Sequence, residues 1–497
     1  LSNLQRPTFH IIEGNNEPSQ ELTTTDGANA LNLHPHVSHS GDFTEASAGR
    51  FIADAFHQQI KYITDSDRWL CWDGTKWEPT GKANAPIKQL TIQAIEALPM
   101  KTKEELAYRK KLLNSAGINS TLTLAATDPR ITIRQEKLDS HHGELNTPGG
   151  IVDLHTGKLQ PPNPARLHTR TTAIAPQNQP TPMWNKFLAE TFDGHPGIAG
   201  YMQQLAGYAA TGYVGAQILP FLHGAGANGK SVLAEVLQQL LADYAEPAPA
   251  NFLMQTQTQH PTEIARLQGA RLVIASEVPE SARFDEVKVK QLTGGDTLTA
   301  RYMHGDFFTF QPTHKLWILG NHQPKVQAGG YSFWRRMRLI PFTNTVPEQN
   351  RIDDLAQQLL EKEGAGILHW IIQGAVKYLN DGLTEPQEVL EATLAYEESE
   401  DHLRRFVEER IQTGGGDYVR IPYREMRAAY ADWCRLEGIK PMTANAFTRE
   451  VQNRFRIATV RSNGGRFYTN CTLLADADEP ENDLGSNPWN DLGGGTK

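Results

Sequence analysis

The chain has 497 residues, of which 39% are hydrophobic, and its formal net charge is -9. This length favours two to four domains with ordinary cores. The negative balance argues against a uniformly basic coat for nucleic acid but allows a basic channel or patch. No apolar run approaches the length of a membrane span and no signal peptide is recognisable, so neither a membrane protein nor a secreted one is expected.

The cysteines and histidines do not indicate a metal site. The three cysteines are far apart in the sequence and form neither a disulfide framework nor a Cys-x-x-Cys pair, so a reducing cytoplasm is expected. Seventeen histidines are present, but no cluster of His and Cys has the spacing of a zinc site. The adjacent pair His141-His142 is therefore predicted to be an exposed loop.

Residues 1–180 divide into a polar arm and an α+β domain. Residues 1–45 are rich in Asn, Thr, Ser and His without hydrophobic periodicity, which predicts a flexible arm. A helical pattern follows, and "RWLCWDGTKWEPT" then alternates around Asp73-Gly74, which predicts a hairpin. Its tryptophans could stack on bases, although aromatic residues beside a tight turn more often pack a sheet. With the turn-rich "LNTPGGIVDLHTGKLQPP", these features predict an α+β domain over 46–180.

The region from 184 to 345 alternates strand-like and helix-like segments, which predicts an α/β domain with a parallel sheet. Within it, "FLHGAGANGKS" (221–231) follows an apolar run, precedes the helical run "SVLAEVLQQLLADY" and fits G-x-x-x-x-G-K-[ST]. Such a loop cradles phosphate, so the N–H groups of 225–230 are expected to hold ATP, Lys230 to neutralise its β and γ oxygens, and Ser231 to ligate Mg²⁺. The predicted ATP-binding residues are Gly224, Ala225, Gly226, Ala227, Asn228, Gly229, Lys230 and Ser231.

Two later strands supply polar groups at their ends. The stretch "ARLVIASEVPE" predicts a strand over Leu272–Ala275, after which Glu277 would bind Mg²⁺ and polarise the attacking water, with Glu280 as the alternative acid. The stretch "HKLWILGNHQP" predicts a further strand that ends at Asn321. The amide of Asn321 could orient the attacking water or detect the γ-phosphate.

A pair of arginines follows in "FWRRMRLIPF". ATP hydrolysis requires a cation that stabilises the transition state, and Arg335 or Arg336 could supply it from a neighbouring subunit. The spacing of the two residues does not choose between them. A solvated charge pair is the alternative interpretation.

The C-terminal part is predicted to be helical and then mixed. Residues 346–398 predict a helical segment, and residues 399–474 predict three helices followed by a hairpin that turns at Asn463-Gly464. This order is typical of a winged-helix domain, which binds DNA or, alternatively, another protein. Residues 475–497 are acidic and glycine-rich and predict a disordered tail. The candidate DNA contacts of this part are Arg449, Arg461 and Arg466.

The order of "GAGANGKS", "RLVIASE", "VKQLTGGDTLTARYMHGDFFTFQPTHKLWILGNH" and "WRRMRLIPF" resembles the superfamily 3 helicases. It is most similar to the phage and plasmid primase-helicase family that is related to the poxvirus helicase-primase, over roughly residues 50–475. Asn228 directly before Gly-Lys-Ser, and the run 290–296, are shared features. The resemblance implies a P-loop ATPase core of AAA+ type, a homo-hexameric ring, and translocation on single-stranded DNA in the 3′ to 5′ direction.

The resemblance also implies a hairpin that enters the channel of the ring. Here that region is "TARYMHGDFFTF", with its tip at Tyr302–Asp306. Many relatives carry a Lys-His tip, which this sequence lacks. The candidate DNA contacts in and near the hairpin are Arg301, His304 and Lys315, with Lys288 and Lys290 as additions to a basic channel.

The function that these features favour is an ATP-dependent replicative DNA helicase of a phage or mobile element, in the cytoplasm of a bacterial host. One alternative is the helicase part of a larger primase-helicase whose primase domain lies upstream. Another is an origin-binding or scaffold protein that uses ATP to assemble. The expected cofactors are ATP and Mg²⁺. The expected partners are single-stranded and forked DNA, further copies of the chain, and a primase, polymerase or origin-binding protein, but no membrane.

Overall fold

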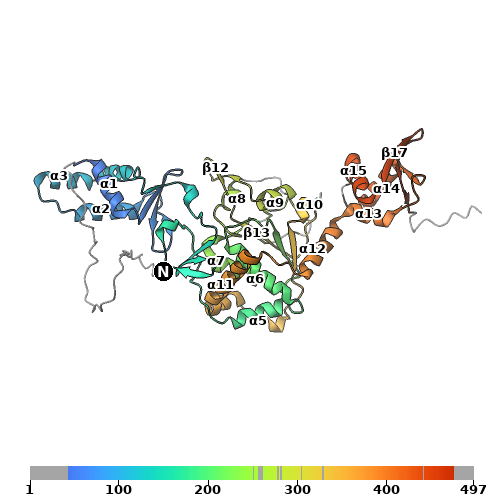
Figure 1. Ribbon diagram of the computed structural model, residues 1–497, viewed down its shortest axis with the longest axis horizontal. Coiled ribbons are helices and arrows are strands. Elements are labelled where there is room, and N and C mark those ends of the chain that lie inside the picture. The colour runs from blue at the N-terminus through green and yellow to red at the C-terminus, as the bar shows by residue number, and fades with distance from the viewer. Residues whose placement is uncertain are drawn as a thin grey trace, which may run out of the picture. The chain divides into compact units, whose positions relative to one another are not determined.

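The computed structural model divides into two compact units, the first ending at Leu394 and the second beginning at Ala395 (Figure 1). The structure describes residues 43–249, 251–255, 261–276, 279, 282–303, 305–326, 330–439 and 441–474. The predicted acidic tail and all but the end of the predicted N-terminal arm lie outside these residues and stay predictions. No helix in the described ranges is long and apolar enough to cross a membrane.

The N-terminal part of the first unit combines a small sheet with helices. The sheet has the order β3-β2-β1-β4. Its hairpin confirms the prediction at Asp73-Gly74, since the Asp73 carboxylate accepts the N–H groups of Thr75 and Lys76 at 2.6 and 2.7 Å. The tryptophans of β2 and β3 are buried, as expected for sheet packing. The elements are α1 (Glu45–Phe56), β1 (Ile60–Ile63), β2 (Arg68–Trp72), β3 (Trp77–Pro79), α2 (Ala85–Ala97), α3 (Lys103–Leu112), α4 (Ser115–Ala125) and β4 (Thr132–Ile133).

A second small sheet connects this part to the centre of the unit. It consists of the antiparallel strands β5 (Glu144–Thr147), β6 (Gly150–Asp153) and β7 (Lys158–Gln160). The predicted turn-rich β segment is therefore confirmed. Leu145, Val152 and Leu154 pack into the same hydrophobic cluster as the central helices. This sheet thus shares a core with the segment that follows it.

The central sheet is parallel throughout, as the sequence predicts. Its order is β14-β8-β13-β10-β9, and each neighbouring pair is parallel. The chain leaves β8 toward one edge of the sheet and leaves β13 toward the other edge. A switch of this kind opens a crevice at the carboxyl ends of the two strands, where ligands bind in open α/β sheets. The strands are β8 (Leu219–His223), β9 (Ala245–Pro247), β10 (Leu272–Ala275), β13 (Lys315–Gly320) and β14 (Met337–Pro341).

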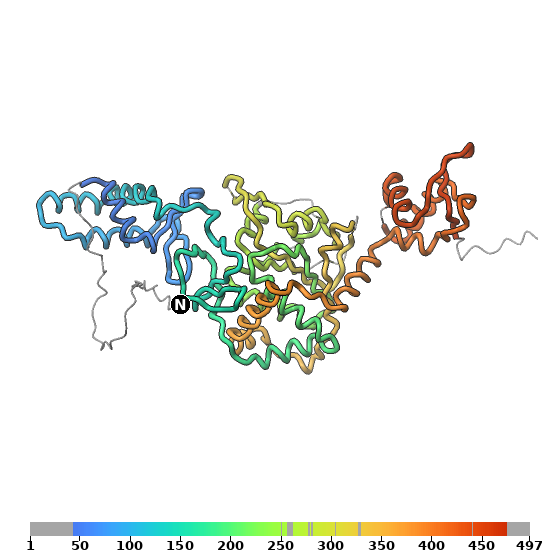
Figure 2. Tube along the Cα trace, viewed as in Figure 1, coloured from blue at the N-terminus to red at the C-terminus, as the bar shows by residue number. Residues whose placement is uncertain are grey.

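Helices distant in sequence pack together beside this sheet. Helices α6 (Pro196–Ala210) and α11 (Leu355–Asp381) lie side by side (Figure 2). Their backbones come so close that a Cβ atom at Gly207 would lie 2.0 Å from the nitrogen of Ala375. The other helices of this region are α5 (Pro182–Thr191), α7 (Lys230–Leu241), α8 (Pro261–Ala265) and α10 (Tyr331–Trp334).

Between β10 and β13 the chain forms helix α9 (Glu286–Thr293) and the antiparallel hairpin of β11 (Leu298–Arg301) and β12 (Phe307–Phe310). In this hairpin Arg301 lies opposite Phe307, so the tip lies at 302–306 as the sequence predicts. Because β12 leads directly into β13, the hairpin lies at the amino end of the central sheet. The crevice lies at the opposite, carboxyl edge.

The second unit contains helices α13 (His402–Arg410), α14 (Tyr423–Leu436) and α15 (Ala444–Phe455) around a core of its own. Helix α12 (Gln387–Glu400) contains the boundary between the units. The predicted hairpin forms at Asn463-Gly464, with Ser462 opposite Gly465. The strands are β15 (Ile411–Thr413), β16 (Arg420–Pro422), β17 (Ala458–Ser462), β18 (Gly465–Thr469) and β19 (Cys471–Leu473), in the sheets β16-β18-β17 and β15-β19.

Candidate functional site

A cavity of about 430 Å³ lies at the carboxyl edge of the central sheet. Lys230 and Ser231 reach it from the start of α7, Ser276 from the end of β10, and Asn321 from the end of β13. The parallel sheet brings together residues that are up to 91 positions apart, because Lys230 and Asn321 follow adjacent strands. The structure therefore brings three predicted site residues, Lys230, Ser231 and Asn321, to one cavity. Ser276, which directly precedes the predicted acid Glu277, lies there as well.

The glycine loop between β8 and α7 is tightly enclosed. A Cβ atom at Gly224 would lie 2.1 Å from the carbonyl oxygen of Phe342. Gly229 has φ of +85°, and a Cβ atom there would meet Thr191 and Phe187 of α5. Only glycine fits at both positions. At Gly224 a side chain has no space, and at Gly229 both the lack of space and the left-handed backbone exclude other residues. The loop thus combines a glycine-rich backbone with an adjoining helix N-terminus, and backbone N–H groups in this arrangement commonly bind phosphate.

Lys230 is held by oxygen atoms of its own loop. Its Nζ donates to the carbonyl oxygens of Gly224 and Ala225 at 2.7 and 2.9 Å, and to Oδ1 of Asn228 at 2.9 Å. Burial lowers the pKa of this ammonium group to about 8. A phosphate at the loop would offer the ammonium a charged acceptor in place of these neutral ones.

Asn228 connects the glycine loop to the residue that directly follows β14. Its side chain is only 3% exposed, and Nδ2 donates to the carbonyl oxygen of Phe342 at 2.9 Å. A second bond joins the same segments, from the N–H of Val346 to the oxygen of Ala227 at 2.8 Å. The sequence marks Asn228 as a shared family feature, but only the fold shows what its side chain contacts.

The predicted acids Glu277 and Glu280 lie outside the described residues, so their roles stay predictions. The described cavity does contain an acid that the sequence motifs do not mark, Glu235. Glu235 and Gln238 lie one and two turns beyond Ser231 on α7, so the helical spacing could have indicated them. His322 also lines the cavity, directly after Asn321.

The two candidate arginines differ in exposure. Arg336 is 7% exposed, and its guanidinium donates to Oγ1 of Thr293 at 3.0 Å and to the carbonyl oxygen of Ser332. Arg335 is exposed and donates to Oε1 of Gln217 at 2.9 Å. Because these contacts bury it, Arg336 is corrected from a candidate finger to a structural group, and Arg335 stays the candidate.

The tip of the β11–β12 hairpin is less basic than a surface that binds DNA phosphates through several cations. Arg301 donates from Nε to the carbonyl oxygen of Gly305 at 2.9 Å and lies over the ring of Phe307, with 5.4 Å to the ring centroid. Met303 and Phe307 are 77% and 64% exposed. His304 lies outside the described residues. Among the residues that the structure describes, the tip and its flanks thus present apolar and aromatic groups beside one arginine, Arg301, and one exposed acid, Asp306.

Lys315 does not belong to a basic channel, and this prediction is wrong. It is buried, and its Nζ donates to the carbonyl oxygens of Thr211 and Thr313. Arg271 donates to the oxygen of Ala210 at 2.6 Å. The two side chains therefore cap the C-terminus of α6, where carbonyl oxygens lack partners within the helix.

Lys288 is also buried, which corrects its place in a basic channel. It lies 3.7 Å from a carboxylate oxygen of Glu263 and over the ring of Phe252. Lys290 is half-buried. The hairpin region therefore has less exposed positive charge than the sequence predicts.

The arginines of the second unit occupy different settings. Arg449 forms an ion pair with Glu450 at 3.3 Å. Arg461 and Arg466 lie directly opposite each other across the β17–β18 hairpin. The guanidinium of Arg466 also lies over the ring of Tyr423, 4.8 Å from its centroid. Like charges in opposing positions destabilise a hairpin, so this pair has a cost in folding.

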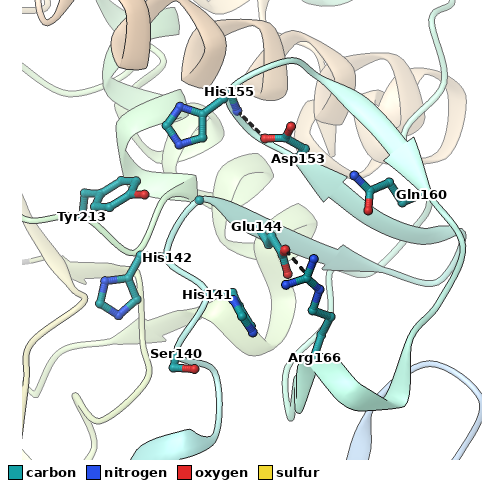
Figure 3. A pocket seen from close by; sticks show the side chains of 10 residues that line it. Ser140, His141, His142, Glu144, Asp153, His155, Gln160, Arg166 and Tyr213 are labelled. Carbon is teal, nitrogen blue, oxygen red and sulfur yellow. Dashed lines mark hydrogen bonds and ion pairs between the residues drawn. The ribbon is translucent and has the colours of Figure 1, made fainter.

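A second cavity, of about 500 Å³, lies beside the β5–β7 sheet (Figure 3). His141, His142 and His155 line it together with Tyr213. The His pair is half-buried, which corrects the prediction of an exposed loop. No group of His, Cys, Asp and Glu able to hold a metal ion occurs among the residues that the structure describes.

Two residues that line this cavity, Glu144 and Arg166, form an ion pair. Glu144 lies 3.5 Å from Arg166 and 3.0 Å from Nε2 of the buried His168 (Figure 3 shows Glu144 and Arg166). Burial lowers the pKa of His168 from its usual value, while the Glu144 carboxylate beside Nε2 acts in the opposite direction. The contact therefore supports the corner between β5 and the segment before α5.

Two family models match the chain. Residues 49–193 match the model described as "D5 N terminal like", and residues 222–351 match one described as "Family of unknown function (DUF5906)". The second match covers the glycine loop, the hairpin and both arginines.

Several viral proteins are similar to part of this chain. A candidate helicase of Acanthamoeba polyphaga mimivirus, L207/L206, is 27% identical over 42% of this chain and 24% of its own length. A candidate helicase of Frog virus 3, 022R, is 27% identical over 45% of this chain and 25% of its own length. A candidate primase of African swine fever virus, C962R, is 22% identical over 46% of this chain and 26% of its own length.

The chain spans about a quarter of the length of these relatives. A solved apo structure of the NrS-1 C terminal region aligns with a TM-score of 0.49 at 12% identity, covering 83% of this chain and 95% of that one. The chain is thus similar to viral helicases and primases and carries a D5-type N-terminal match over residues 49–193.

Proposed function

We propose that the chain is an ATP-driven DNA helicase, the motor of a replication protein. The observation that carries the proposal is the convergence of Lys230, Ser231 and Asn321 at one cavity, beside a loop with no space for side chains at two of its glycines. Nucleotide at this edge would follow the general rule for ligands of parallel sheets. The central sheet is then a P-loop core of AAA+ type.

The residues around the cavity fit MgATP. The N–H groups of 225–230 would bind the phosphates, and the Ser231 hydroxyl, on the second residue of α7, would ligate Mg²⁺. Lys230 would exchange its three neutral acceptors for phosphate oxygens. Asn321 would orient the attacking water, and Glu277 would supply the carboxylate that Mg²⁺ and the water need.

Arg335 would act on the nucleotide of a neighbouring subunit. It lies just before β14, whereas the far end of β14 reaches Asn228 through Phe342. Five strand residues span roughly 16 Å, which places Arg335 too far from its own loop to touch a γ-phosphate there. A ring of subunits, six by resemblance to the family, would bring each Arg335 to the next site.

Two surfaces would contact DNA. The β11–β12 tip would touch the single strand in the ring, where aromatic groups stack on bases without sequence preference. The second unit would act as a winged helix on the fork, with Arg461 and Arg466 against the phosphates. Their unfavourable pairing across the hairpin supports a binding role, because an anion between them would relieve the repulsion.

A second candidate is the helicase segment of a larger primase-helicase. The lengths of the relatives favour it, since each is about four times longer than the part aligned with this chain. In either case ATP and Mg²⁺ would drive 3′ to 5′ movement on DNA.

Forked-DNA unwinding tests the proposal. The wild type is expected to unwind a fork with a 3′ tail in the presence of MgATP, and Lys230→Ala is expected to lose this activity. The matched control is Lys186→Ala, which removes an exposed lysine whose Nζ lies 3.7 Å from a carboxylate oxygen of Glu190. Unwinding by Lys230→Ala at the wild-type rate would overturn the nucleotide site, and wild-type ATP turnover without unwinding would favour a scaffold function.

A further inference from the structure

A single glutamine amide joins two regions that the proposed motor uses. Gln217 lies two residues before β8, at the amino edge of the central sheet. Its Oε1 accepts from Nη2 of Arg335 at 2.9 Å, and its Nε2 donates to the carbonyl oxygen of Gly294 at 2.6 Å. No sequence motif marks this residue, so its importance emerges only from these two contacts.

The backbone at Gln217 is unusual for a residue with a side chain. Its φ is +50°, in the left-handed region, and its N–H donates to the oxygen of Val214 at 3.2 Å. Residues other than glycine occupy this region at a cost, so they persist there when the surrounding contacts determine the conformation. The turn directs the amide between its two partners.

Gly294 belongs to the corner that leads from α9 to the hairpin. The carbonyl oxygens at the end of a helix lack partners within the helix. Here Gln217 binds the oxygen of Gly294, and the ring of His314 lies 3.1 Å from the oxygen of Leu292. Strand β11 begins four residues after Gly294. The corner therefore sets the base of the hairpin.

The connection between Arg335 and Gly294 needs both the acceptor Oε1 and the donor Nε2 of the Gln217 amide. Gln offers a donor and an acceptor on one rigid group, whereas Glu offers only acceptors and Leu offers neither. Arg335 is exposed, so without Oε1 its long side chain would sample many rotamers. The neighbouring Arg336 contacts Thr293 in the same corner but is buried.

We propose that Gln217 is a positioning residue that couples the hairpin to Arg335. When nucleic acid displaces the hairpin, the corner at Gly294 moves, and the amide transmits this movement to the guanidinium that would reach the next subunit. The proposal rests on the proposed function for the role of Arg335, but the physical link between the two ends can be tested without any activity.

The activity test compares Gln217→Leu with a matched control. Gln203 has the same two-ended pattern, because it donates to the oxygen of Trp370 at 3.1 Å and accepts from Lys377 at 2.6 Å. Gln217→Leu is expected to keep nucleotide affinity and basal ATP turnover and to lose at least about fivefold of the DNA stimulation. Gln203→Leu is expected to keep all three. Full DNA stimulation in Gln217→Leu would overturn the proposal.

Amide hydrogen exchange tests the link in the nucleotide-free protein. Arg335→Ala and Gln217→Leu are both expected to speed exchange in 292–301, whereas Gln203→Leu leaves it unchanged. If the wild type lacked ATP turnover but showed this pattern, the link would stand and the proposed function would fail. If neither variant changed exchange in 292–301, the link itself would be refuted, whatever the activity.

Discussion

Asn228 and Phe342 are joined by a hydrogen bond of 2.9 Å from the side-chain amide of the first to the main-chain oxygen of the second. The other atom of the same amide, Oδ1, accepts from the ammonium group of Lys230. One buried side chain thus fixes both the shape of the glycine loop and the place of its lysine. The end of β14 is thereby tied to the proposed phosphate site.

Asn228→Ala is expected to weaken binding of a non-hydrolysable ATP analogue about tenfold and to lower the free energy of unfolding by about 1–3 kcal/mol, because the oxygen of Phe342 loses its partner. Titration calorimetry and thermal melting measure the two effects. Asn344→Ala is the control, since that half-buried amide lies outside the glycine loop and donates to the oxygens of Glu190 and Asp193 at 3.1 and 3.4 Å. Wild-type affinity in Asn228→Ala would show that the loop keeps its shape without this hydrogen bond.

Nucleotide affinity is expected to fall as the pH rises above about 8. Burial lowers the pKa of Lys230 to about 8 in the nucleotide-free state, and only the protonated amine attracts phosphate. Bound phosphate favours the charged form and raises this pKa, so binding takes up a proton above pH 8 and affinity falls by up to about tenfold per pH unit. Calorimetry in buffers of different ionisation enthalpy measures the uptake. Affinity that stays constant between pH 7 and pH 9.5 would contradict the role of Lys230.

Mixed assemblies are expected to show that Arg335 acts between subunits. Arg335→Ala and Lys230→Ala are each expected to abolish ATP turnover, and mixing them should restore part of it because intact sites form at some mixed interfaces. Arg336→Ala is expected to lower the melting temperature instead, since it removes the hydrogen bonds to Thr293 and Ser332. No recovery in verified mixed rings would count against a finger supplied by the neighbour.

The hairpin tip is expected to bind single strands by two separable effects. Arg301→Ala should reduce the salt dependence of binding and lower unwinding more than basal ATP turnover. Phe307→Ala should weaken binding by about 1–3 kcal/mol at low and high salt alike, because stacking is not screened. Fluorescence anisotropy across a salt series distinguishes them. Equal losses of unwinding and basal turnover would point to damaged folding.

Charge reversal at one arginine of the second unit is expected to separate folding from binding. Arg461→Glu places opposite charges across the hairpin and should stabilise the unit by about 0.2–1 kcal/mol. The same change should weaken fork binding and lower its salt slope by about one unit for each phosphate that the side chain no longer neutralises. Higher stability with unchanged fork affinity would assign this surface to protein contacts.

The sequence by itself determined the local elements of this protein. The glycine loop, the strand before it and the helix after it are encoded by neighbouring residues, and so are the hairpins at 73–74 and 463–464, whereas the hairpin at 302–306 was expected from the family resemblance. Alternation and turn chemistry act over a few positions, so a single sequence contains the information that they need. The run of strand and helix segments also favours a parallel sheet, because such segments must cross over.

Only the tertiary structure decided which side chains are free to act. Lys315 begins an apolar strand, and its burial depends on the end of a helix that lies 104 residues earlier. The partner of Arg335 is 118 residues away, and that of Asn228 is 114 residues away. No local period carries such information, because the contacts arise from the order in which the strands pair. A charged residue next to a buried strand can cap a helix or reach solvent, and the choice follows from what the fold places against it.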